Sequence, residues 1–410
     1  MSTPSELYRN AIDLNRFSNS VAKRIAITYN DLVLDSVDKL RGLDELTAPA
    51  KAARLRAILA QLKQSLDGWA GASTTSVVAD LQGLAVLQDE FVTEQLRRAL
   101  PLGMRDQVRS IQISSNFAQS VATVDPTQLN IVSLSDDLQA AVSGAGATFQ
   151  LTAAQGTTMT LPNGKVLEKS FRGLAESQAD LFARTVRNGL LTGESPDAIA
   201  RELKGTLRFD QPGSARQIAQ AGGRVTSMAN HQIMALVRTS ITQVANETSQ
   251  QVYKANQDIT NKYRYVATLD SRTSPICRAL DGQEFEYGKG PTPPQHFNCR
   301  STTVPIIDYE GLGLTPPPPS QLRRPNTVSG PSRVRRDGTV PDDQTYGQWL
   351  ELQSRAVKDD VLGPTKVPYF EFLVNKYGPT DAIRKFVARD GSELTLAQLR
   401  RRGYGLPTSD

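Results

Sequence analysis

The sequence predicts a predominantly helical α+β protein. Apolar residues recur at helical spacing through the first hundred residues, and a second long helical pattern covers about residues 225–256. Short stretches of alternating apolar and polar residues follow, which is typical of small strands. We therefore expect an N-terminal helical region, a central long helix packed on a small α+β module, and a short C-terminal helical tail. A chain of 410 residues is long enough for two or three domains.

Residues 1–103 are predicted to form a helical docking region. Two glycines with a following Ser/Thr run predict a break at Gly68–Gly71, and a second break is expected at Pro101–Gly103. These breaks would leave one helix ending near residue 66 and another over about residues 77–100. The apolar residues of the first helical stretch are Leu7, Ile12, Leu14, Val21, Ile25 and Leu32.

Residues 104–169 are predicted to be a connector with a small β element, because Ser, Thr, Gly and Ala dominate there and the helical periodicity is lost. A strand–turn–strand is expected over Thr157–Leu167. Its turn would be Pro162–Asn163–Gly164, since Asn–Gly supplies the positive φ angles of a tight hairpin.

Residues 170–312 are predicted to be the core module. A helix should begin near Ser170 and end near Leu191, and Ser195 should cap another helix that starts at Pro196. The long helix follows. Beyond it we expect a tight turn at Asp281–Gly282, an edge strand marked by Pro305, and strands over about residues 263–268, 284–287 and 301–307.

Residues 313–344 are predicted to be a Pro/Arg-rich linker, because Pro316–Pro319 resist both helix and sheet. Its basic residues would form a flexible strap that contacts DNA phosphates non-specifically; a solvated linker kept extended by charge and proline is the alternative. These residues are Arg323, Arg324, Arg333, Arg335 and Arg336. Residues 345–410 are predicted to be a tail segment with Trp349 and two helices.

Composition and charge narrow the class of protein. Apolar residues make up 39% of the chain, but no run of about 18 of them occurs, so a membrane span is not expected. The first residues lack the basic and apolar parts of a secretion signal. A net charge of +5, spread along the chain, argues against a dedicated DNA-binding protein. Two cysteines without a signal peptide indicate synthesis in a reducing cytoplasm.

The cysteines and histidines predict a metal site. All of them lie between His231 and Cys299. His296 and Cys299 are three positions apart, a spacing that lets both reach one ion, and Cys277 could supply a third ligand from across the Asp281–Gly282 turn. Asp270 or His231 would be the fourth ligand, and zinc is the ion that such a set favours.

Two other interpretations of the thiols stay open. Cys277 and Cys299 could be buried apolar residues, with His296 bonded to the backbone of its loop. They could also form a disulfide in an oxidising environment.

Asp270 and Arg272 form a second constellation. They could act as an acid and an anion clamp, or as a turn cap with a salt bridge; the structural interpretation is preferred. The sequence contains no His-Glu-x-x-His, no Gly-x-Ser-x-Gly and no Gly-x-x-x-x-Gly-Lys motif. No hydrolase site emerges from these patterns.

The order of motifs between Thr268 and Ile307 resembles the core of the phage Mu head-morphogenesis family. An Asp-x-Arg-Thr turn, a Cys, a Leu-x-Gly turn and a Pro-x-His-x-Asn-Cys-Arg signature follow one another. The helix with Arg238 and Thr239 is similar to the family's Arg-Thr-Glu helix, although Ser240 stands where Glu is usual. The motif positions, beside the cysteines and His296, are Asp270, Arg272, Thr273, Asp281, Gly282, Asn298 and Arg300.

The resemblance implies a minor head protein of a tailed bacteriophage, made in the host cytoplasm and located inside the head of the virion. It implies association with the portal protein and with the major capsid or scaffold protein, a part in head morphogenesis, and contact with DNA during packaging or ejection. It also implies that the protein is not an enzyme. A hydrolase or toxin-like cargo that uses the Asp270–Cys299 loop is the alternative.

Overall fold

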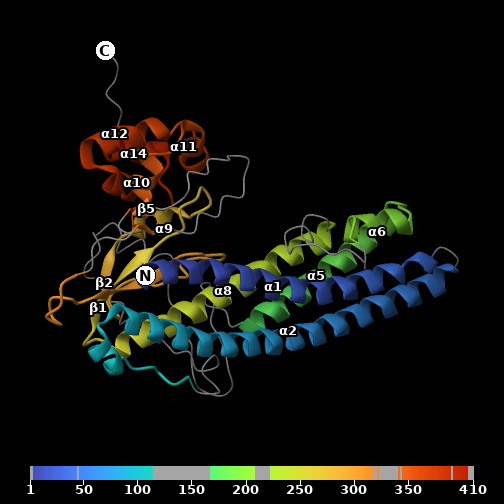
Figure 1. Cartoon of the computed structure of the whole chain (residues 1–410). Coiled ribbons are helices and arrows are strands. Elements are labelled where there is room, and N and C mark those ends of the chain that lie inside the picture. Colours follow the sequence, from blue (N-terminus) through green and yellow to red (C-terminus); the bar gives the residue numbers. More distant parts are fainter. Residues whose placement is uncertain are drawn as a thin grey trace, which may run out of the picture.

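The computed structural model of the chain describes residues 3–43, 46–113, 167–207, 222–316, 321–322, 340–341, 344–388 and 391–404. Long helices form an elongated arm, a small sheet lies at one end of it, and a lobe of short helices stands on the sheet (Figure 1). The predicted class, a predominantly helical α+β protein, is confirmed. None of the described helices is both long and apolar enough to cross a membrane.

In the part of the chain that the structure describes, five helices build the arm around one apolar core. They are α1 (Thr3–Asp38), α2 (Ala48–Ala99), α5 (Leu167–Leu191), α6 (Pro196–Lys204) and α8 (Arg224–Ala255), with the short turn η1 (Arg41–Leu43) between the first two. Each of these helices contributes buried side chains to the same cluster. The N-terminal helices and the predicted long helix therefore share a single core.

Trp69 lies at the centre of this core and explains one wrong prediction. Its ring makes edge contacts with Tyr29 at 5.3 Å and with Phe171 at 5.7 Å between centroids. The predicted break at Gly68–Gly71 does not occur, because α2 runs unbroken through it. A glycine costs a helix about 1 kcal/mol, which the burial of the neighbouring tryptophan outweighs.

The second predicted break is confirmed, since α2 ends at Ala99, before Pro101, and a 3-10 turn, η2 (Leu102–Gln107), follows. Asn256 then ties this region to the end of α8. Its side-chain amide accepts from the backbone N–H of Arg109 and donates to the Arg109 carbonyl, both at 2.8 Å. The segment after α2 is thus held against the C-terminus of the long helix.

The predicted helices of the core module are present. Ser195 caps α6, its hydroxyl accepting from the backbone N–H of Ala198. The long helix predicted over about residues 225–256 is α8. The hairpin turn predicted at Pro162–Asn163–Gly164 lies outside the described residues.

The sheet of the core module has three antiparallel strands in the order β2–β1–β3. These are β1 (Thr260–Val266), β2 (Glu284–Glu286) and β3 (Thr302–Ile307), and Pro305 does lie on an edge strand, opposite Tyr263. Gln250 and Tyr253 of α8 bond Thr303 of β3. The sheet is therefore anchored to the arm. The two-residue strands β4 (Gln321–Leu322) and β5 (Val340–Pro341) pair with each other.

The described residues of the C-terminal lobe form five short helices, not the two that were predicted. Gly363 and Gly378 end two of them with positive φ angles, and Thr345 and Thr395 start new ones with capping boxes. These local stops divide the segment more often than its apolar pattern indicated. The helices are α10 (Tyr346–Glu351), α11 (Arg355–Leu362), α12 (Val367–Tyr377), α13 (Pro379–Arg384) and α14 (Leu396–Arg401).

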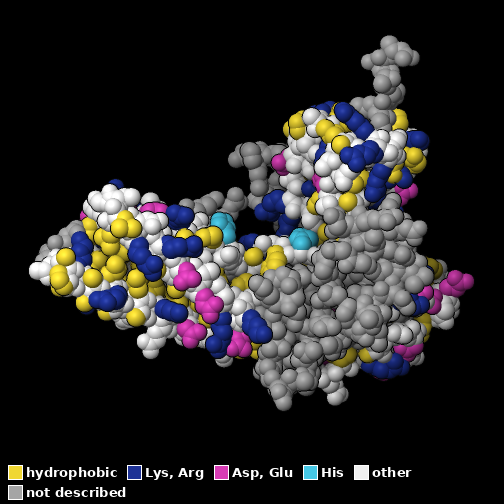
Figure 2. Space-filling view, turned by 180° about the vertical axis from the view of Figure 1, so that it is seen from behind, with side chains coloured by type: hydrophobic (Ala, Val, Ile, Leu, Met, Phe, Trp, Pro, Cys, Tyr) yellow, Lys and Arg dark blue, Asp and Glu magenta, His cyan; other side chains and the backbone are white. Residues whose placement is uncertain are grey.

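The lobe and the arm are separated by a hollow. Seen from behind, the surface is hollowed between the long helices and the C-terminal lobe, and Lys and Arg side chains gather along it (Figure 2). Beneath the lobe, Leu269 of the core module is buried among the lobe's apolar residues. The module that joins arm and lobe therefore lies at the base of the hollow.

Replacing Phe171 by Ala should lower the free energy of unfolding by about 3–5 kcal/mol. The ring is 0% exposed and packs on Trp69 at the centre of the arm. Urea unfolding followed by far-UV circular dichroism measures the change. Leu87 of α2 is 65% exposed and serves as the control; Leu87→Ala should change the value by less than about 0.5 kcal/mol. Equal effects of the two substitutions would contradict this packing.

Candidate functional site

The motif residues lie on one compact stretch of the core module. A turn over Asp270–Thr273 follows β1, a short helix α9 (Pro275–Leu280) follows the turn, and a loop over residues 288–301 leads from β2 to β3. Ser274 begins α9 by accepting from the backbone N–H of Cys277. In Figure 1, α9 lies between the sheet and the C-terminal lobe.

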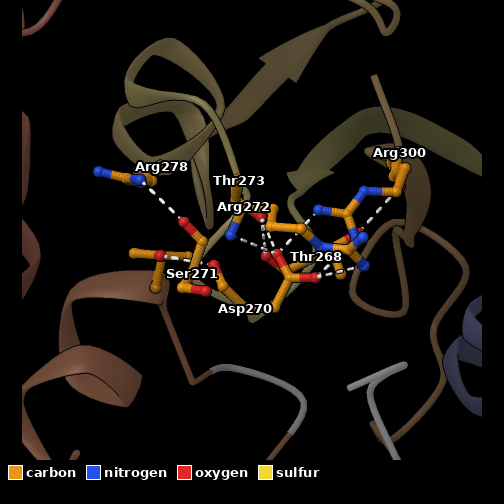
Figure 3. Close-up of polar contacts among 8 residues, drawn as sticks. Thr268, Asp270, Ser271, Arg272, Thr273, Arg278 and Arg300 are labelled. Atoms are coloured by element: carbon orange, nitrogen blue, oxygen red, sulfur yellow. Dashed lines mark hydrogen bonds and ion pairs between the residues drawn. The ribbon is translucent and has the colours of Figure 1, made fainter. Parts of the chain in front are cut away.

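Asp270 and Arg300 join the two ends of this stretch. The Arg300 guanidinium donates to both carboxylate oxygens of Asp270, at 2.6 and 2.8 Å (Figure 3). The same carboxylate accepts from the backbone N–H of Arg272 and from the hydroxyl of Thr273, both at 3.1 Å. The Asp270 side chain is only 5% exposed. Asp270 thus acts here as a turn cap and a buried ion-pair partner.

Arg272 makes the expected salt bridge with Asp270, but it is not the closest partner of this carboxylate. Its side chain is half exposed, and its guanidinium lies 3.6 Å from the Asp270 carboxylate. The bidentate partner of Asp270 is instead Arg300, thirty positions along the chain. Burial would lower the pKa of Arg300, but its hydrogen bonds and attraction to Asp270 raise it.

Asp281 connects the sheet to the C-terminal lobe. One carboxylate oxygen accepts from the backbone N–H of Ala267 at 2.7 Å, and the other accepts from the backbone N–H of Tyr346 at 2.6 Å. The next residue, Gly282, has φ +78°, and a Cβ there would lie 2.8 Å from Thr345. Both the backbone conformation and the close approach of the lobe therefore require glycine at this position.

Arg278 and Tyr346 make further contacts between the module and the lobe that were not predicted from the sequence. The buried Arg278 donates to the carbonyl of Val361 at 3.0 Å and pairs with Glu393 at 3.4 Å. The Tyr346 hydroxyl donates to the Asp270 carbonyl at 2.8 Å. The one sequence signal for the Arg278 contacts was the presence of an arginine in an otherwise apolar short helix. This signal did not indicate that Val361 and Glu393 are its partners.

Cys277, His296 and Cys299 come together as a potential metal-binding group. Their ligand atoms all lie within 4.8 Å of one another. The Sγ of Cys277 is 3.3 Å from Nε2 of His296 and 3.7 Å from the Sγ of Cys299. Both thiols are 1% exposed and neither forms a disulfide in this structure. The hydroxyl of Tyr265 lies beside them, 3.2 Å from the Cys277 sulfur.

The orientation of His296 suits a metal ligand. Its Nδ1 lies 2.8 Å from the carbonyl of Phe297. A proton on Nδ1 would donate to this carbonyl and leave the Nε2 lone pair directed at the two sulfurs, which is the usual outer-shell arrangement of a ligating histidine. The same contact is also the loop hydrogen bond expected if the thiols are merely buried.

The pKa values of Cys299 and His296 are shifted in opposite directions. Burial would raise the pKa of Cys299, but hydrogen bonds with Cys277 and His296 and attraction to His296 hold it well below its usual value. The pKa of His296 is raised, since its interaction with Cys299 outweighs burial. Burial and the neighbouring Cys299 raise the pKa of Cys277. Cys299 is therefore the more acidic of the two thiols, and a thiolate is the form that binds metal.

The spacing of the three ligand atoms fits a tetrahedral zinc. With Zn–S bonds of about 2.3 Å, two thiolates on one tetrahedral ion lie about 3.8 Å apart, and a thiolate and an imidazole nitrogen about 3.5 Å apart. The observed distances of 3.7 and 3.3 Å are close to these values. A covalent disulfide would require about 2.05 Å.

The two candidates for a fourth ligand do not join the group. Asp270 is engaged with Arg300, and His231 is exposed near the start of α8. Thr242, which bonds the Cys299 carbonyl at 3.0 Å, is eleven positions further along that helix, a distance of about 16 Å. The predicted DNA-contact residues of the linker, Arg323, Arg324, Arg333, Arg335 and Arg336, lie outside the described residues.

The long helix supports the loop of His296 and Cys299 from the arm side. Asn298 has a positive φ of 61°, a conformation that asparagine tolerates, and its backbone N–H donates to the Thr239 hydroxyl at 3.0 Å. Arg238 reaches the Asn298 side chain at 3.5 Å. Ser240, where the resembling family usually has Glu, is buried and bonds the Leu236 carbonyl within its own helix.

Comparison with known proteins identifies one related family. Residues 180–304 match the family described as Phage Mu protein F like protein, and this segment runs from α5 to β3. The match confirms the resemblance predicted from the sequence, over less than a third of the chain. No curated protein and no solved structure matches the chain.

Replacing Asp281 by Ala should loosen the C-terminal lobe. The change leaves the backbone N–H groups of Ala267 and Tyr346 without their acceptor, at a cost of about 1–3 kcal/mol for each buried donor. Hydrogen exchange should therefore accelerate at Tyr346 and along α10. Asp13, which is exposed and pairs only with Arg16 in the same helix, is the matched control. Unchanged exchange at Tyr346 in D281A would show that this carboxylate does not hold the lobe.

Proposed function

We propose that this chain, whose residues 180–304 carry the Phage Mu protein F like region, is a minor head protein of a tailed bacteriophage. It acts in head morphogenesis, associates with the portal and with the major capsid or scaffold protein inside the head, and takes part in packaging or ejection of DNA. The family match is the observation that carries this proposal. The motif residues support it, because their hydrogen bonds and ion pairs join the turn after β1, the loop before β3 and the C-terminal lobe.

The contacts of the motif residues favour an assembly function over catalysis. The carboxylates of Asp270 and Asp281 accept from backbone and side-chain donors that connect the sheet with Arg300 and with the lobe. Cys299, the thiol with the lowered pKa, is 1% exposed. A hydrolase acting at this loop would need a substrate to reach these atoms, so the alternative function has less support.

The Cys277–His296–Cys299 group is proposed to bind zinc with a structural function. Two thiolates and an imidazole are ligands that zinc prefers, and their spacing fits a tetrahedral ion. The three residues come from α9 and from the loop before β3, and no disulfide joins these two segments. Bound zinc would hold these segments together and keep the surface of the loop in one shape.

Purified protein should contain about one zinc ion per chain by elemental analysis. Cys277→Ser, Cys299→Ser and His296→Ala should each lower the zinc content and the midpoint of thermal unfolding, because each removes a ligand. His231→Ala is the matched control, since this exposed histidine lies away from the group. Absence of zinc, together with unchanged stability in chelator, would overturn the zinc proposal and leave the family assignment intact.

Intact phage particles should contain this protein at far fewer copies than the major capsid protein. Quantitative mass spectrometry of purified particles measures the ratio, and cross-linking identifies the neighbour in the head. Particles formed without the protein should show reduced head assembly or reduced DNA content. Its absence from purified virions and from assembly intermediates would contradict the proposed location.

A further inference from the structure

Tyr265 places a hydroxyl group inside the apolar core of the module, directly beside the two thiols. The residue belongs to β1, is 0% exposed, and packs in the same apolar cluster as Cys277 and Cys299. Its hydroxyl oxygen lies 3.2 Å from the Cys277 sulfur. A buried hydroxyl is unfavourable unless it makes a hydrogen bond. The Cys277 sulfur is therefore a partner that this hydroxyl uses in the folded protein.

Ser301 adds further donors next to the same sulfurs. It lies directly before β3 and is only 4% exposed. Its hydroxyl interacts with both the Tyr265 hydroxyl and the Cys277 sulfur, and its backbone N–H donates to Cys299. Hydrogen-bond donors from β1 and from the residue before β3 thus lie around both thiols.

Such an environment suits thiolates better than thiols. The sulfur of a neutral thiol is a weak acceptor, whereas hydrogen bonds to an ionised group are about twice as strong as neutral ones. A thiolate also has no proton of its own, so the Tyr265 hydroxyl must then be the donor. Zinc binding requires both cysteines in this form, although the apolar core opposes their charge. Donors beside the sulfurs offset this opposition.

We propose that Tyr265 is an outer-shell residue of the zinc site, and that its hydroxyl donates to the zinc-bound thiolate of Cys277. The inference rests on the proposed zinc site at Cys277, His296 and Cys299. Tyr265 acts as a positioning residue: it orients Cys277 and stabilises its charge, while the phenol keeps its proton and supplies no ligand atom. Ser301 supports Cys299 in the same way through its backbone N–H.

Zinc titration of the full-length protein against a chromophoric chelator tests this assignment. Tyr265→Phe removes only the hydroxyl and should weaken zinc binding by about 10–100-fold, the usual effect of losing an outer-shell partner. Cobalt in place of zinc gives a second measurement. The thiolate-to-cobalt charge-transfer band should move to longer wavelength in Y265F, because a hydrogen bond lowers the energy of the sulfur electrons. The band position is read on the metal-loaded protein, so it reports on this bond even if Y265F is less stable.

Tyr263 provides a matched control two positions earlier on the same strand. It is also 0% exposed and packs in the same cluster, but its hydroxyl donates to the Pro291 carbonyl at 3.2 Å. Y263F removes the same group from the same core, so it should lower the zinc affinity far less and leave the cobalt band in place. Equal losses of affinity and an unshifted band in both variants would show general loosening of the module and overturn the assignment.

Ultraviolet difference spectra distinguish an outer-shell tyrosine from a ligand. Zinc binding to the unaltered protein should produce no tyrosinate absorption. A tyrosinate band that appears with zinc and is missing in Y265F would show a direct phenolate ligand and refute the outer-shell position. If the unaltered protein binds neither zinc nor cobalt, the proposed zinc site fails and this inference fails with it. Zinc binding that is unchanged in Y265F refutes the Tyr265 assignment alone.

Discussion

The buried ion pair between Asp270 and Arg300 is the interaction on which the core module depends. It joins the turn after β1 to the last residues before β3, and the cysteines lie between these two points, Cys277 just after the turn and Cys299 directly before Arg300. The Asp270 side chain is almost fully buried, so loss of this bidentate pair would be strongly destabilising. An electrostatic contact outside the Cys277–His296–Cys299 group therefore helps to set the relative position of the two thiols.

Both the lobe and the arm make hydrogen bonds to the turn and loops of the core module. From the lobe, Tyr346 bonds the Asp270 carbonyl and the Asp281 carboxylate; from the arm, Thr239 and Thr242 bond the backbone of Asn298 and Cys299. These contacts use polar groups of the motif as structural acceptors and donors.

Local signals predicted much of this structure, and long-range contacts limited the rest. The long helix, the Ser195 cap, the strands and the edge position of Pro305 follow from periodicity, capping and backbone chemistry that lie within a few residues. The break at Gly68–Gly71 was wrong because Trp69 packs on residues far away in the chain, and the tail has more helices because its glycine stops were not recognised. The grouping of Cys277, His296 and Cys299 was predictable from their spacing. The bond from Tyr346 to Asp281 spans 65 positions, and no local pattern indicates it.

The apolar core of the arm is completed late in synthesis, because the helices that form it lie far apart in the sequence. The hairpin of α1 and α2 is complete at Ala99, yet its apolar face is covered by α5, which begins at Leu167, and by α8, which ends at Ala255. At usual rates of translation, the interval between residues 99 and 255 lasts roughly 10–30 s. Tyr29 of α1 is already present to pack on Trp69, but Phe171 and the apolar residues of α8 follow only later in synthesis. The exposed apolar face of the nascent hairpin is therefore a surface that a chaperone can bind. Where several chains are synthesised close together, this face also favours exchange of hairpins between them.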